Sequence, residues 1–134
     1  MAVNLSDDKV IAGNRTLGKA QTALAKHRMA KLSFNRDFEP AYGTAVQVSP
    51  LVRRLTCNNP SAFTFTGTGS YIVGRGNVAV IDPGPDDDQH LDAILAAVDG
   101  ETVSHIVITH THRDHSPLAA RLQEITGAKT YGYG

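Results

Sequence analysis

Three histidines and one aspartate lie within six residues of this chain. They are spaced H-x-H-x-D-H, and the four members are His110, His112, Asp114 and His115. Imidazole nitrogens and carboxylate oxygens are ligands that zinc accepts in proteins. Because the run that leads into the cluster is apolar, we expect residues 105–110 to form a buried strand that delivers the ligands to the carboxyl edge of a sheet. The spacing therefore predicts a metal site at the end of a strand.

The same cluster predicts chemistry that uses two metal ions. His110 and His112 are predicted to bind one metal. Asp114 and His115 are predicted to reach a second metal on the other side of the turn. Two neighbouring metals share a bridging water, lower its pKa, and hold both the attacking and the leaving oxygen of a scissile bond. We expect Asp114 to orient that water as the catalytic residue, so the predicted reaction is hydrolysis of an ester or amide.

The cluster resembles the signature of the metallo-β-lactamase-fold hydrolases. A second match, residues 78–84, is similar to the family's strand that ends in an I-D-x-G turn. This resemblance places Asp82 where the family has an aspartate that supports the metal-binding loop. Residues 59–71 and the pair at residues 116–117 resemble the lactamase-β-like-protein-2 branch, whose mammalian members act as ribonucleases on single-stranded RNA. The glyoxalase II relatives are the nearest alternative branch.

The resemblance also implies a fold and a missing part. It implies an α/β (α+β) chain that forms the N-terminal half of a four-layer αββα sandwich, incomplete here. The family's second half supplies a third histidine to each metal and a bridging aspartate, whereas this chain has no His or Asp after His115. We therefore expect the N-terminal part of a dinuclear zinc hydrolase, inactive alone, that requires the C-terminal half. Manganese or iron would suit the same ligands.

For the whole protein the expected bond is an ester, thioester or phosphodiester, in a small-molecule or single-stranded RNA substrate. A different class of function is also open: the chain is a stand-alone metal-binding or nucleic-acid-binding module. In that case a homodimer would complete each metal site across a symmetric interface.

The first 45 residues differ in charge from residues 46–134, which carry the resemblance. The net charge of the chain is zero, but between Lys9 and Arg36 there are seven Lys or Arg and no acid. We interpret residues 1–45 as a basic extension, partly helical or disordered. A basic helix over residues 16–32 would contact nucleic acid, and the same composition is typical of a transit peptide.

Composition bounds the compartment. The chain has 134 residues, 41% of them hydrophobic, which is typical of a soluble globular protein. No apolar run reaches the ~20 residues of a membrane span, so we expect no membrane partner. Cys57 is the single cysteine and suits a reducing compartment. We expect the cytoplasm, or an organelle if the basic start is a transit peptide.

Local patterns predict the elements that position the cluster. Strands are expected over residues 45–48, 51–57, 62–66, 71–73, 77–81 and 129–133. One helix is predicted to begin at Pro85 and to end before Gly100, with His90 on its surface. A second helix is predicted to be capped by the hydroxyl of Ser116 and to end at Gly127.

Overall fold

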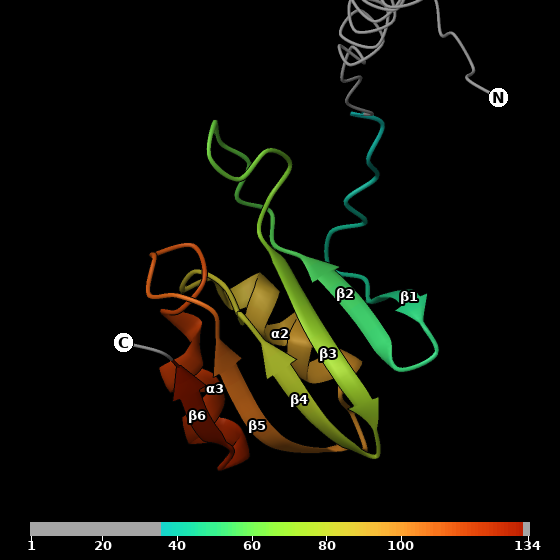
Figure 1. Ribbon diagram of the computed structural model, residues 1–134, viewed down its shortest axis with the longest axis vertical. Coiled ribbons are helices and arrows are strands. Elements are labelled where there is room, and N and C mark those ends of the chain that lie inside the picture. The colour runs from blue at the N-terminus through green and yellow to red at the C-terminus, as the bar shows by residue number, and fades with distance from the viewer. Residues whose placement is uncertain (1–35, 133–134) are drawn as a thin grey trace, which may run out of the picture. The chain divides into compact units, whose positions relative to one another are not determined.

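Six strands form one sheet whose spatial order follows the chain (Figure 1). The computed structural model describes residues 36–132, so the basic helix predicted over residues 16–32 lies outside the described residues. The strands are β1 (Val46–Ser49), β2 (Val52–Thr56), β3 (Gly69–Arg75), β4 (Asn77–Ile81), β5 (Thr102–Ile108) and β6 (Lys129–Gly132). The pairs from β1 to β4 are antiparallel, and β5 and β6 join in parallel. The predicted α/β class is confirmed.

The segment between β2 and β3 is a loop, so the strand predicted over residues 62–66 is wrong. Within the described part of the chain, its strand-like pairing is a single isolated bridge between Ser61 and Phe65. Ser61 Oγ accepts hydrogen bonds from the backbone N–H groups of Phe63 and Thr64, both at 3.1 Å. Hydroxyl side chains that bind nearby backbone groups compete with strand pairing. The Thr-Phe alternation therefore folds on itself instead of extending the sheet.

Helix α2 (Asp88–Ala97) follows β4, and its predicted start at Pro85 is wrong. Asp87 is the N-cap, with extended backbone, and its Oδ1 accepts from the backbone N–H of His90 at 2.7 Å. A carboxylate at the N-cap satisfies one of the unpaired N–H groups of the first turn. This cap fixes the helix start three residues after the proline.

Helix α3 (Leu118–Thr126) follows β5, and the predicted Ser116 cap is also wrong. Pro117 occupies the cap position and makes no side-chain hydrogen bond. The Ser116 hydroxyl instead donates backwards to His112 O at 3.3 Å. At the other end Gly127 adopts a left-handed φ of 70°, as a C-cap glycine does. The Ser116 hydroxyl thus binds the preceding turn, and α3 begins without a side-chain cap.

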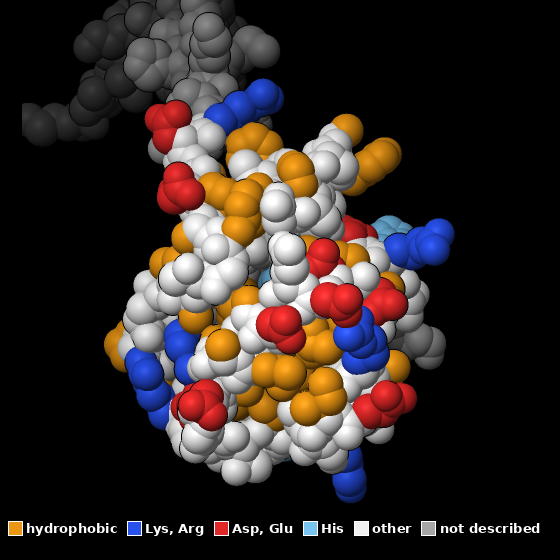
Figure 2. Space-filling view, turned by 180° about the vertical axis from the view of Figure 1, so that it is seen from behind, with side chains coloured by type: hydrophobic (Ala, Val, Ile, Leu, Met, Phe, Trp, Pro, Cys, Tyr) orange, Lys and Arg blue, Asp and Glu red, His pale blue; other side chains and the backbone are white. Residues whose placement is uncertain are grey.

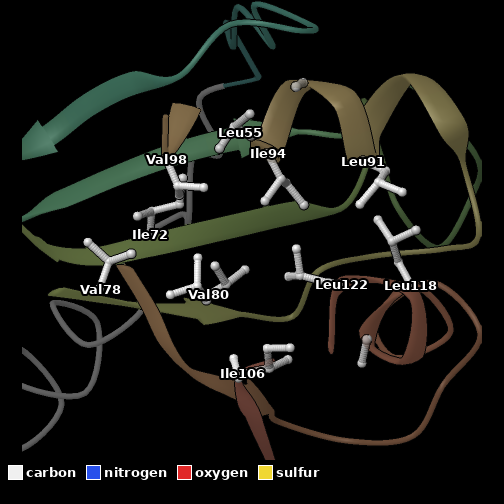
Figure 3. Close-up of a cluster of buried hydrophobic side chains, with 14 of the residues drawn as sticks. Leu55, Ile72, Val78, Val80, Leu91, Ile94, Val98, Ile106, Leu118 and Leu122 are labelled. Atoms are coloured by element: carbon white, nitrogen blue, oxygen red, sulfur yellow. The ribbon is translucent and has the colours of Figure 1, made fainter. Parts of the chain in front are cut away.

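Both helices pack on the same face of the sheet. Figure 3 shows side chains from α2, α3 and the central strands pointing toward one another. The most buried members are Leu55, Ile72, Val78, Val80, Leu91, Ile94, Val98, Ile106, Leu118 and Leu122. Full burial of one such side chain contributes about 1.5–3 kcal/mol. Among the residues described here, no helix combines the length and apolar character that a membrane span requires.

The outer surface of the helices carries charged and hydrophobic side chains together. Figure 2 views the face that carries them and shows acidic, basic and hydrophobic side chains intermixed. Arg121 of α3 pairs with Asp86 and Asp88 at the start of α2, each at 2.7 Å, and all three side chains are exposed. Exposed ion pairs contribute little to stability. We therefore assign these acids to a solvated helix start.

The opposite face of the sheet carries an apolar row. Tyr71, Ile81, Val107 and Tyr131 are register partners on successive strands β3 to β6. Tyr71 is 39% exposed and Tyr131 is 46% exposed. Within residues 36–132 both helices lie on the other face, so this row faces outward.

A cluster of hydrogen bonds around Arg53 and Glu101, the Arg53–Glu101 cluster, lies at the end of the sheet away from the H-x-H-x-D-H segment. Arg53 Nη1 donates to Ala97 O at 2.6 Å, and Arg53 Nη2 pairs with Glu101 Oε2. Glu101 Oε1 accepts from Gly76 N at 2.8 Å. The Gly76 backbone bond and the Arg53 guanidinium hold the pKa of Glu101 below its ordinary value.

Replacing Glu101 with glutamine is expected to lower the free energy of unfolding by about 1 kcal/mol at pH 7. A carboxyl whose pKa is lowered by folding stabilises the protein above its unfolded pKa and loses that contribution as the pH falls. The difference between wild type and Glu101→Gln should therefore shrink below pH 4.5, the ordinary pKa. Urea unfolding of both proteins at several pH values measures this difference in the free energy of unfolding. Asp86→Asn, in an exposed pair, is the control. An equal loss of unfolding free energy in both variants would contradict a stabilising role of the Arg53–Glu101 cluster.

Candidate metal centre

The H-x-H-x-D-H segment forms a turn between β5 and α3. The backbone N–H groups of His115 and Ser116 both donate to His112 O, at 3.0 and 3.2 Å. The ring centroid of His110 lies 4.6 Å from that of His112 and 4.2 Å from that of His115. The turn thus brings the three predicted imidazole ligands together at the carboxyl end of β5.

Asp82 lies beside this turn, at the carboxyl end of the neighbouring parallel strand β4. Its Oδ1 accepts from Thr109 N at 2.7 Å, and its Oδ2 accepts from Thr109 Oγ1 at 2.6 Å. The same Oδ2 lies 3.1 Å from His115 Nδ1. Asp82 is 6% exposed and has a left-handed φ of 47°, which is uncommon for a residue with a side chain. Its carboxylate therefore joins the end of β5 to the last histidine of the cluster.

These bonds select one tautomer for two of the histidines. Thr109 Oγ1 gives its single proton to Asp82, so at its 3.0 Å contact with His110 Nδ1 it must accept. His115 Nδ1 donates to the Asp82 carboxylate, which only accepts. In both rings Nδ1 is the nitrogen that donates, so Nε2 is the nitrogen that would bind a metal once it carries no proton. Anchoring of the second ring nitrogen by a carboxylate is typical of zinc-binding histidines.

Asp114 lies against the same ring from the other side. Its Oδ2 is 3.3 Å from His115 Nε2, the atom that a metal would use. Among residues 36–132, no three His, Cys, Asp or Glu side chains are arranged to hold a metal ion. The donor types and tautomers fit zinc, and ligation by His115 requires Asp114 to move off that nitrogen.

An open pocket of about 690 Å³ adjoins the turn. It is lined by Asn59, Ser61, Phe63, Thr64, Pro85, His110, His112, Arg113, Asp114 and His115. Phe63 is 98% exposed, so an apolar side chain stands free at its rim. The loop that carries Phe63 is closed by Asn59, which accepts from Thr68 N at 2.8 Å and donates to Thr68 Oγ1 at 3.0 Å. A substrate bound at the cluster would contact this loop.

His90 is the feature near the site that the sequence analysis missed. It is 4% exposed, so its predicted position on the surface is wrong. His90 Nε2 lies 2.8 Å from Ser70 Oγ, which donates to Asp82 O at 2.6 Å. Burial lowers the pKa of His90, and the nearby Asp87 carboxylate opposes that shift. The available signal was its position four residues before Ile94, because residues i and i+4 share one side of a helix and Ile94 is on the buried side of α2.

The sequence profile of the metallo-beta-lactamase superfamily matches residues 64–134. A lactamase-like protein from Pestalotiopsis microspora is 38% identical over 110 residues, which cover 72% of this chain and 34% of that protein. An atrochrysone carboxyl ACP thioesterase from Aspergillus terreus is 34% identical over 107 residues, covering 78% of this chain and 33% of that protein. The profile includes all four residues of the cluster and Asp82.

Two solved structures share the fold. A beta-lactamase domain protein from Burkholderia ambifaria has a TM-score of 0.55 and 26% identity, covering 72% of this chain and 33% of that chain. A metallo-beta-lactamase from Cronobacter sakazakii has a TM-score of 0.51 and 24% identity, covering 65% of this chain and 33% of that chain. The chain thus spans about a third of the length of the proteins it resembles.

Proposed function

Because the chain belongs to the metallo-beta-lactamase superfamily, we propose that it is the N-terminal part of a zinc-dependent hydrolase that cleaves a thioester. The observation that carries the metal assignment is the pair of anchored imidazoles, His110 and His115, whose Nδ1 atoms are held by Thr109 and Asp82 so that Nε2 is the nitrogen left for a metal. The thioester rests on relatives that are named ACP thioesterases. A phosphodiester in single-stranded RNA is the alternative bond.

Each residue of the cluster has a proposed role. His110 and His112 would hold one zinc, and Asp114 and His115 would hold the other. Bound zinc would supply a Lewis acid and activate water near neutral pH. Asp82 keeps the proton of His115 on Nδ1, through its 3.1 Å contact. The Asp114 carboxylate, which now lies against His115 Nε2, would accept a hydrogen bond from the attacking water and orient it.

The pocket supports an acyl substrate. Phe63 and Pro85 line it together with the cluster and provide apolar contact surface. Burial of an acyl chain against such side chains contributes about 25 cal/mol per Å². The acyl carbon would then lie over the histidines, with the apolar chain directed along the loop that carries Phe63.

Metal binding tests the centre directly. Zinc per chain is measured after dialysis against metal-free buffer, in the longer product of the gene that carries the C-terminal half, for wild type, His110→Ala and the control His105→Ala. His105 is an exposed histidine of β5 whose Nδ1 contacts Ser104, away from the cluster. We expect wild type and His105→Ala to bind zinc alike, and His110→Ala to lose it. Equal zinc in His110→Ala would overturn the metal assignment.

Turnover tests the reaction and the need for further chain. An acyl thioester of pantetheine and a single-stranded RNA oligonucleotide are offered to the 134-residue chain and to any longer product of its gene. We expect zinc-dependent thioester hydrolysis only in the longer product. RNA cleavage in its place would favour the phosphodiester. A discrete dimer of the 134-residue chain with tightly held zinc and its own turnover would support the stand-alone module.

A further inference from the structure

A buried chain of hydrogen bonds runs from helix α2 to the candidate metal centre. It begins at His90, whose Nε2 lies 2.8 Å from Ser70 Oγ. It continues from Ser70 Oγ to Asp82 O at 2.6 Å. His90, Ser70 and Asp82 are all buried. The Asp82 carboxylate in turn contacts Thr109 and His115, so Asp82 links α2 and β3, through its carbonyl, to the turn that follows β5.

The direction of each bond in this chain is fixed. A backbone carbonyl only accepts, so the single hydroxyl proton of Ser70 is given to Asp82 O. Ser70 Oγ therefore accepts at its other contact, and His90 Nε2 must carry a proton and donate it. His90 is thus a donor that no aliphatic side chain replaces.

His90 also supports the site through van der Waals contact. A Cβ built on Gly84 would lie 3.1 Å from His90 Cδ2, so the imidazole packs directly against that glycine. Gly84 N donates to His115 O at 3.0 Å, and Gly84 O accepts from Leu118 N at 3.1 Å. The His90 ring therefore packs against Gly84, the residue whose backbone binds His115 at one end of the segment 115–118 and Leu118 at the other.

We propose that His90 is a positioning residue of the metal centre. By donating to Ser70 it holds the Asp82 backbone in its left-handed conformation, and so aims the Asp82 carboxylate at Thr109 and His115. A residue in this conformation persists when its surroundings over-determine it. A buried polar ring is costly unless it is hydrogen-bonded, and leucine would fill the same place on the apolar side of α2. The Ser70 bond is what the histidine adds.

The test uses the metal-free 134-residue chain with His90→Leu, His90→Gln and the control His105→Leu. Amide hydrogen exchange is followed by NMR at Thr109, whose N–H donates to Asp82, and at Val80 in the core. We expect His90→Leu to speed exchange at Thr109 about tenfold more than at Val80. Glutamine retains an N–H donor and should restore most of the protection. Equal acceleration at both amides, or no rescue by glutamine, would overturn the proposal.

Ser70→Ala breaks the same line from its middle and covers the case in which His90→Leu does not fold. It should also accelerate exchange at Thr109 selectively, and a uniform change across the chain would count against the proposal. The inference rests on the proposed function only in calling the site a metal centre. The hydrogen-exchange test itself is done without metal. Zinc affinity is measured separately, in the longer product that carries the C-terminal half: a wild type that binds no zinc there refutes the metal centre and leaves the exchange result intact. Where wild type binds zinc, His90→Leu should weaken it about tenfold.

Discussion

Replacing Gly67 with alanine is expected to lower the free energy of unfolding by about 3–5 kcal/mol. Gly67 has a φ of 141°, a conformation that residues with a side chain rarely adopt. A Cβ at this position would lie 1.9 Å from the backbone oxygen of Cys57, which is far inside contact distance. Cys57 N donates to Thr68 O at 2.9 Å, so the clash falls on a residue whose own backbone is held beside the end of the β2–β3 pairing. Moving β2 or β3 apart to relieve the clash would disturb the buried side chains of Leu55 and Ile72.

Urea unfolding of Gly67→Ala measures this loss, and Gly43→Ala is the matched control. Gly43 also has a left-handed φ, of 70°, but nothing lies within 4 Å of its added Cβ. The control should therefore cost only the conformational term, about 1–2 kcal/mol. Similar losses in the two variants would show that the close approach to Cys57 has no energetic weight. Because Gly67 closes the loop that carries Phe63, the variant should also broaden the NMR signals of that loop.

Replacing Asp82 with alanine is expected to cost about 3 kcal/mol of stability and to weaken zinc binding by about 10–100-fold. The variant leaves the Thr109 N–H, the Thr109 hydroxyl and His115 Nδ1 without their acceptor. Alanine is also less suited than aspartate to the left-handed φ of 47°. The loss of the carboxylate frees the His115 ring to adopt the other tautomer, which puts a proton on the Nε2 that a metal needs.

Asp82→Asn separates the backbone effect from the carboxylate effect. Asparagine tolerates the left-handed region and keeps one acceptor oxygen, so it should recover about half of the lost stability. Its amide donor faces other donors, so zinc binding should stay weak. Urea unfolding and zinc competition with a chromophoric chelator give the two quantities. Full recovery of zinc affinity in Asp82→Asn would contradict the role given to the carboxylate.

Much of the architecture is present in local patterns. The spacing of Leu91, Ile94, Leu95 and Val98 predicts the apolar side of α2; three of them are buried and Leu95 is partly buried. Glycine at residue 127 predicts the end of α3, because a left-handed C-cap favours it. The superfamily match to residues 64–134 agrees with the resemblance that the H-x-H-x-D-H spacing and the Asp-Pro-Gly turn indicate.

The errors share one physical cause, which is competition from partners that a periodic pattern does not reveal. Residues 62–66 alternate like a strand, but Ser61 supplies a local acceptor that turns the chain back. His90 is predicted to lie on the surface of its helix, whereas its partner Ser70 lies 20 residues earlier on β3 and draws it into the interior. The Ser61 contacts are local and the Ser70–His90 pair depends on the folded topology, and neither kind of hydrogen bond follows from the spacing of apolar residues.

The hydrogen bonds that shape the metal centre have a consequence for the order of synthesis. Every bond that joins His90, Ser70, Asp82, Gly84 and the turn falls between residues 70 and 118. Chains emerge from the ribosome amino end first, and N-terminal units fold before later ones are made. A nascent chain that has exposed residue 118 therefore already contains every partner needed to fix the imidazole tautomers. One contiguous stretch of chain thus holds all the bonds that shape the ligand geometry, and we expect that geometry to form before the residues after 118 are needed.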